Sequence, residues 1–132
     1  MTVKQVIVIR KDLNMRRGKE IAQGSHASMG FLISRLCLYI SNVIVPANLF
    51  SSWELEWMEG DFTKIVCQIQ GEEALLNLYN ELKDKFACHL IQDKGLTEFR
   101  QPTYTALAIG PYYSHLLDEW VGPNGKYPLK LY

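Results

Sequence analysis

The sequence contains little that would mark a secreted or disulfide-stabilised protein. It has only three cysteines, Cys37, Cys67 and Cys88, which are widely spaced and form no CxxC pair. An odd number at this spacing predicts no disulfide framework. It favours a reducing compartment, in which we expect all three thiols to be buried as small apolar side chains.

Targeting and membrane signals are also absent from the pattern. The first residues lack the basic-then-apolar order of a signal peptide. The longest apolar stretch, residues 31–40, is interrupted by Ser34 and Arg35 and is too short to cross a bilayer. We therefore expect a cytoplasmic protein with no membrane partner.

The net charge is zero, because 14 basic residues balance 14 acidic ones. This balance argues against a strongly basic surface that binds nucleic acid over the whole molecule. The charge is nevertheless uneven, since the first 20 residues carry six Lys or Arg and only two acidic residues. Such asymmetry predicts a local edge that faces anions, with an ordinary solvated charge cluster as the alternative that charge alone leaves open.

Motifs for metal and nucleotide chemistry are not found. The sequence has no HExxH, no CxxC and no carboxylate cluster, so we predict no metal site and no cofactor. Gly18-Lys19 is not a phosphate loop, because the glycine five residues upstream and the Ser or Thr after the lysine are both missing.

The strongest positive feature is a strand that leads directly into a helix. Residues 3–10 have a β pattern, and a helical pattern runs from about residue 18 to 36. Arg16, Arg17 and Lys19 lie where this helix begins. Because unpaired N–H groups and the helix dipole favour anions there, the sequence predicts a phosphate-bearing partner.

The rest of the chain alternates strands with helices. Ser51 and Glu54 have capping-box spacing for a short helix, and Ala22, His26, Met29, Ile33 and Leu36 share one face of the long helix, which we expect to be buried. The alternation predicts a layered α/β sandwich in one domain, residues 1–132, with part of the sheet antiparallel. The expected strands after residue 10 are 64–70, 88–93 and 103–110, and the expected later helices begin near 72 and 115.

Polar residues follow two of these strands. If the first and third strands lie side by side in parallel, Lys19, Asp93 and Thr97 could converge at their carboxyl ends. Gln23 lies one helical turn beyond Lys19 and faces the same cleft. Spacing alone favours a structural Lys19–Asp93 ion pair, and a buried core histidine is the favoured interpretation of His26.

These residues resemble the type 2 (archaeal/eukaryotic-type) peptidyl-tRNA hydrolases. The resemblance lies in residues 6–27, in the run Asp-Lys-Gly-Leu-Thr-Glu from Asp93, in the strand from Thr103 to Pro111, and in the final Leu-Lys-Leu-Tyr. A tryptophan-bearing helix before the second strand also falls in family order. Together the motifs are specific and cover almost the whole chain.

The resemblance implies a three-layer α/β/α fold with a four-stranded mixed sheet, commonly in a homodimer. It implies metal-independent cleavage of the ester between a peptide and the 3′ end of tRNA. Position by position, Lys19, Asp93 and Thr97 match the residues to which the family's catalysis is attributed. Gln23, Thr105 and His26 match supporting positions.

Apart from these site residues, candidates for tRNA phosphate contacts are Arg16, Arg17 and Lys11, which would make the affinity for tRNA salt-dependent.

Two alternative functions remain open: a non-catalytic tRNA-binding or regulatory protein of the same fold, and a hydrolase of another small ester. The sequence departs from the family pattern at Lys94, where alanine is common, and at Gln101-Pro102, which replaces a common Pro-Gly.

Overall fold

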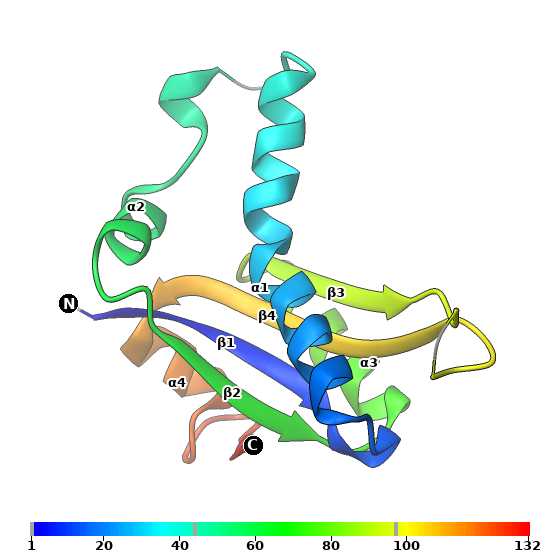
Figure 1. The fold of residues 1–132 in the computed structure, drawn as a ribbon. Coiled ribbons are helices and arrows are strands. Elements are labelled where there is room, and N and C mark those ends of the chain that lie inside the picture. Colours follow the sequence, from blue (N-terminus) through cyan, green and yellow to red (C-terminus); the bar gives the residue numbers. More distant parts are fainter. Residues whose placement is uncertain (1, 44, 97) are drawn as a thin grey trace.

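The computed structural model describes residues 2–43, 45–96 and 98–132, and over these residues the chain forms an α/β fold around a five-stranded mixed sheet (Figure 1). The strands are β1 (Val3–Arg10), β2 (Lys64–Ile69), β3 (Cys88–Asp93), β4 (Thr103–Tyr113) and β5 (Lys130–Leu131). The helices are α1 (Arg17–Ile40), α2 (Ser52–Glu59), α3 (Glu72–Leu82) and α4 (Ser114–Val121), with 3-10 turns η1 (Lys11–Leu13) and η2 (Pro46–Asn48).

The sheet has one more strand than expected. Its order is β3-β4-β1-β2-β5, and the two-residue β5 pairs antiparallel with β2 at Cys67–Leu131 and Gln68–Lys130. The expectation of four strands was therefore wrong. A two-residue strand has too short a pattern to be recognised in the sequence.

The expected adjacency of the first and third strands also needs correction. β4 lies between β1 and β3 and runs antiparallel to both. β1 and β3 therefore run in the same direction, and their carboxyl ends lie at the same edge of the sheet. The convergence predicted for that edge survives, although the two strands are not neighbours.

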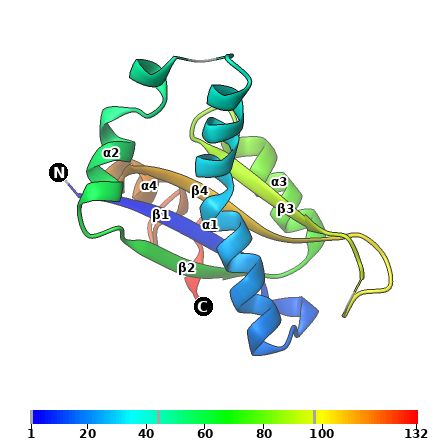
Figure 2. The same cartoon turned by 45° about the horizontal axis from the view of Figure 1, so that its top comes forward.

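Alternation along the strands gives the sheet two buried faces. On one face of the sheet, the core packed against α3 and α4 contains Val6, Val8 and Leu107. On the other face, the core packed against α1 contains Ile7, Ile9 and Ala108. Figure 2 shows α1 crossing over β1 and β4, with α3 and α4 behind the sheet. The helices thus lie on both faces, as the alternation of strands and helices predicted.

The buried face of α1 is not the expected one. Met29, Ile33 and Leu36 are exposed by 52%, 48% and 41%, and Ala22 and His26 are exposed as well. The buried residues of the helix are Gln23, Ala27, Ser28 and Phe31. Polar residues occupy this face because specific hydrogen bonds satisfy them: Ser28 Oγ donates to Gln5 Oε1 at 2.6 Å.

The thiols do not share one environment. Cys67 is buried and Cys88 is half-buried, but Cys37 is exposed on the second half of α1, so the expectation that all three are buried was wrong. Burial raises the pKa of the Cys88 thiol to about 12, so this thiol stays protonated near neutral pH.

A bidentate ion pair joins α1 to α2. Arg35 Nη1 and Nη2 donate to the two Glu54 carboxylate oxygens at 2.6 and 2.9 Å, and Glu54 also accepts the Ser51 backbone N–H at 2.8 Å. The capping box predicted from Ser51 and Glu54 is therefore confirmed. No helix in the described residues is both long and apolar enough to cross a membrane.

Candidate active site

Lys19 and Asp93 meet where the amino end of α1 passes the carboxyl end of β3. Lys19 Nζ donates to Asp93 Oδ2 at 2.6 Å, and the side chains are only 14% and 12% exposed. The convergence predicted for Lys19 and Asp93 is thus present. Thr97, the third predicted member, lies outside the described residues.

Two further predicted residues extend this pair into the protein. Gln23 Nε2 donates to the same Asp93 oxygen at 3.1 Å, and Thr105 Oγ1 on β4 donates to Gln23 Oε1 at 2.5 Å. Gln23 is 2% exposed and Thr105 is fully buried. The chain of hydrogen bonds fixes the amide orientation of Gln23, so that its NH₂ group faces Asp93.

The surroundings of Asp93 favour its charged form. The Lys19 hydrogen bond and the Gly95 backbone N–H, which donates to Asp93 Oδ1 at 2.8 Å, lower the pKa of this carboxyl below its ordinary value. Gly95 has a φ of 80°, and a Cβ there would lie 2.5 Å from the Gln101 carbonyl carbon. Glycine is therefore required for the turn that aims its N–H at the carboxylate.

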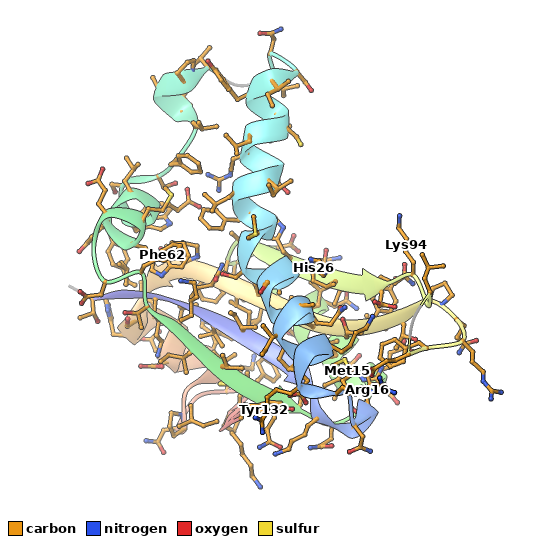
Figure 3. The ribbon with its side chains drawn as sticks, viewed as in Figure 1. Met15, Arg16, His26, Phe62, Lys94 and Tyr132 are labelled. Atoms are coloured by element: carbon orange, nitrogen blue, oxygen red, sulfur yellow. The ribbon has the colours of Figure 1, made fainter. Side chains whose placement is uncertain are left out.

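His26 is a surface residue and not the core histidine that the sequence favoured. It lies on the flank of α1 that faces β3 and lines, with Lys19, Gln23 and Asp93, a hollow of about 340 Å³ (Figure 3). We call this the central hollow. Lys94 is exposed at its rim, and Figure 3 shows its side chain pointing outward from the end of β3.

Apart from Lys19, the basic residues of the first 20 positions divide into two groups. Lys4 and Arg10 are structural: Lys4 pairs with Asp118 at 2.7 Å, and the largely buried Arg10 pairs with Asp12 at 2.7 Å. Lys11, Arg16 and Arg17 are exposed around the amino end of α1, and we call them the basic end.

Arg16 of the basic end lines a second hollow, whose lining also includes Lys19, Glu98 and Phe99. Arg16 is the N-cap residue of α1, and its side chain is 89% exposed. Its nearest acidic partner is Glu98, at 3.7 Å, and Phe99 lies 5.5 Å from Lys19 Nζ. Gly95 and Glu98 lie in the motif that begins at Asp93 but were assigned no role from the sequence, and Phe99 was missed because no motif marks that residue.

No group of three His, Cys, Asp or Glu side chains in the described part of the chain is placed to hold a metal ion. The described residues of the site supply the carboxylate of Asp93, the ammonium group of Lys19, the amide of Gln23, the hydroxyl of Thr105 and the neighbouring imidazole of His26. Such a set can orient water, stabilise an oxyanion and hold a phosphate group.

Comparison with known proteins shows to which family the chain belongs. A family model described as "Peptidyl-tRNA hydrolase PTH2" matches residues 3–126. The chain belongs to the PTH2 family of peptidyl-tRNA hydrolases. The resemblance predicted from residues 6–27, the Asp93 loop and the last long strand is confirmed.

Archaeal members of the PTH2 family are similar along nearly their whole length. A peptidyl-tRNA hydrolase of Methanocaldococcus jannaschii is 32% identical over 122 residues, which are 91% of this chain and 96% of the relative. Those of Sulfurisphaera tokodaii and Methanopyrus kandleri are 32% and 34% identical, over 92% and 90% of this chain and 96% and 93% of theirs.

Proposed function

We propose that this chain is a cytoplasmic peptidyl-tRNA hydrolase whose residues 1–132 form one catalytic domain, and that Lys19, Asp93 and Thr97 carry the reaction. The hydrogen-bonded series from Thr105 through Gln23 to Asp93, with Lys19 on the same carboxylate oxygen, is the observation that carries the proposal. A purely structural ion pair has no need of a buried amide held in one orientation beside it.

The first step is attack of water on the ester carbonyl carbon. Asp93 orients this water through its carboxylate and accepts its proton as the new C–O bond forms. Because Lys19 and Gly95 keep the pKa of Asp93 low, the carboxylate is a weak base, and orientation is its main contribution. The Lys19 ammonium group stabilises the negative charge that develops on the carbonyl oxygen.

The second step breaks the bond between the carbonyl carbon and the ribose oxygen. The proton taken from water passes to that ribose oxygen, which leaves as the terminal hydroxyl of tRNA, and the peptide leaves as a carboxylic acid that releases its remaining proton to solvent. We assign Thr97 to orienting the water or the ribose oxygen. His26, on the wall of the central hollow, is assigned to contact the ribose or the peptide next to the ester.

The basic end supplies the tRNA-binding surface in this proposal. Lys11, Arg16 and Arg17 are exposed, and Arg16 lines one hollow together with Lys19, so phosphates of the acceptor end can contact this surface while the ester reaches Lys19. This division leaves most of the neutral molecule without a role in RNA binding.

We also propose that the protein is a homodimer. Leu36, Tyr39 and Ile40, here called the apolar tip of α1, are exposed by 41%, 42% and 75%. Figure 1 shows this half of the helix extending beyond the sheet. An exposed apolar group of this kind favours a protein–protein contact.

A single-turnover assay on two substrates tests the function. The purified protein is given a peptidyl-tRNA and, separately, a short uncharged ester. Our proposal predicts release of peptide from the tRNA and little turnover of the short ester. Binding of tRNA without ester cleavage would instead favour the non-catalytic alternative, and comparable turnover of both would favour a general small-ester hydrolase.

A further inference from the structure

The central hollow continues in two directions that differ in charge. Towards the amino end of α1 it shares Lys19 with the second hollow, which contains Arg16 and Glu98. Along the seam between α1 and β3 it shares His26 and Ile91 with a third hollow of about 510 Å³. We call this third one the edge hollow.

The edge hollow has an uncharged lining and follows an open strand. Apart from its two histidines, its lining consists of apolar residues, glycine, serine and tyrosine; it includes Met29, Ile33, Ser34, Tyr79, His89 and Leu90. β3 is the terminal strand of the sheet, and within the described residues its only strand partner is β4. The lining takes residues from both faces of β3, so the hollow runs along the free backbone edge.

The floor of the edge hollow is set by a close approach of α1 to β3. A Cβ at Gly30 would lie 2.8 Å from His89 Cβ, so the helix reaches the strand only because residue 30 has no side chain. Burial and the nearby Arg35 lower the pKa of His89, which favours the neutral imidazole. The hollow is therefore uncharged near neutral pH where it meets β3.

We propose that the edge hollow binds the peptide part of the substrate as an extended chain beside β3. The proposal rests on the proposed function, since it starts from an ester carbonyl at Lys19 and Asp93. Two hollows continue from the central hollow at that point. The second hollow, which is lined by charged residues, suits the phosphates of tRNA, and the uncharged edge hollow is left for the peptide.

The geometry also sets the direction and length of the bound peptide. Its esterified carboxyl end lies at Asp93, the carboxyl end of β3, so the peptide runs parallel to β3. Six strand residues at about 3.3 Å each accommodate about five or six peptide residues. Main-chain hydrogen bonds to an edge strand are largely independent of sequence, which suits an enzyme that meets many different peptides.

A pair of matched variants tests this subsite. Ile33→Arg places a charge in the edge hollow at a side chain that is 48% exposed, so the fold tolerates it. Ile21→Arg is the control: it makes the same change on the same helix, at a side chain 64% exposed, but it lies on the opposite flank in a hollow bordered by β2. The readout is the ratio of kcat/KM for a six-residue peptidyl-tRNA to that for an N-acetylated aminoacyl-tRNA of the same tRNA.

Because both substrates carry the same tRNA, effects on RNA binding cancel in this ratio. We expect the wild-type ratio to exceed one, to fall about tenfold in Ile33→Arg, and to be unchanged in Ile21→Arg. A wild-type ratio near one, or equal ratios in the two variants, would overturn the peptide subsite while leaving the hydrolase activity standing.

Two other outcomes are distinct from these. If Ile33→Arg alters the mass of the particle in sedimentation but not the ratio, a second copy covers the edge hollow and the subsite proposal fails. If the wild type cleaves neither substrate, the proposed function itself fails, and the subsite with it.

Discussion

The environment of a single carboxyl group, Asp93, distinguishes this site from an ordinary surface ion pair. Three donors converge on it: the Lys19 ammonium group and the Gln23 amide, which lie one turn apart on α1, and the backbone N–H of Gly95 in the loop after β3. The Lys19 and Asp93 side chains are only 14% and 12% exposed, so these donors take the place of the water that would otherwise solvate the carboxylate. The arrangement fits a carboxylate held charged and in one orientation for use on a substrate.

The pKa of Asp93 is the property to measure at this scale. Lys19→Gln removes the main cause of its depression, so we expect the pKa of Asp93 to rise towards the ordinary aspartate value. A lowered folded-state pKa stabilises the fold above the unfolded-state value, and this contribution is lost as pH falls through the folded-state pKa. The variant should therefore be less stable than the wild type near neutral pH, and this difference should shrink as the pH falls through the wild-type pKa of Asp93.

Carboxyl-carbon NMR titration of Asp93 in both proteins checks this expectation. Asp12, whose pKa is lowered chiefly by Arg10, is the internal control and should titrate identically in the two. Equal Asp93 midpoints in wild type and variant would show that Lys19 does not control this carboxyl.

At the scale of single residues, motifs in the sequence predicted which side chains meet at the site. They did not predict which side chains are buried. Lys19, Gln23, Asp93 and Thr105 were all expected at the site and do meet. His26 was expected in the core because it lies among apolar residues of α1, yet the helix turns that flank outward. Pattern counting could not show this, since the buried flank is occupied by polar side chains with specific partners.

Among the secondary-structure elements, α1 determines most of the site. Its first turns hold Lys19 and Gln23, its amino end carries Arg16 and Arg17 of the basic end, and its second half extends past the sheet (Figure 1). Strand and helix positions were largely predictable, because periodicity and the capping box mark them locally. The two-residue β5 and the insertion of β4 between β1 and β3 were not, because strand order depends on packing between distant segments.

The ion pair between α1 and α2 is expected to be a main stabilising contact of these helices. Glu54 is 1% exposed, so Arg35→Met would leave a buried carboxylate without its charged partner. We expect the free energy of unfolding to fall by about 3 kcal/mol, measured by urea denaturation. Lys4→Met, which removes the more exposed Lys4–Asp118 pair, should cost less than about 1 kcal/mol.

The basic end should act on binding more than on chemistry. Arg16→Gln combined with Arg17→Gln should raise KM for peptidyl-tRNA with a smaller effect on kcat. It should also reduce the slope of log Kd for tRNA against log salt by about 1.5. Lys83→Gln combined with Lys85→Gln, beyond the end of α3, is the charge-matched control and should change neither; an unchanged KM and salt slope in the arginine variant would contradict the assignment.

The whole molecule combines zero net charge with a strong local separation of surfaces. Exposed basic side chains lie around the amino end of α1, and exposed apolar side chains are concentrated on its second half. In the proposed function only this small basic edge has to face the tRNA, so binding of a polyanion does not require a positive net charge.

Self-association is the property that tests the apolar tip. We expect Ile40→Glu to shift the protein from dimer to monomer in sedimentation equilibrium, because it places a charge in the proposed contact. Leu131→Glu changes a side chain that is 70% exposed on β5 and should leave the mass unchanged. A wild-type monomer at micromolar concentration would contradict the dimer outright.

The central claim is that Lys19 and Asp93 act in ester cleavage and are not only an ion pair. The most direct measurement is the single-turnover rate on peptidyl-tRNA for Lys19→Ala, Asp93→Asn and Lys4→Ala, with the melting temperature of each. Lys4→Ala removes a pair of similar length, 2.7 against 2.6 Å, near the opposite end of β1. We predict that the two site variants remain folded and that their single-turnover rates fall about 100-fold or more, whereas Lys4→Ala keeps the wild-type rate. Rates close to wild type in folded Lys19→Ala and Asp93→Asn would contradict the account.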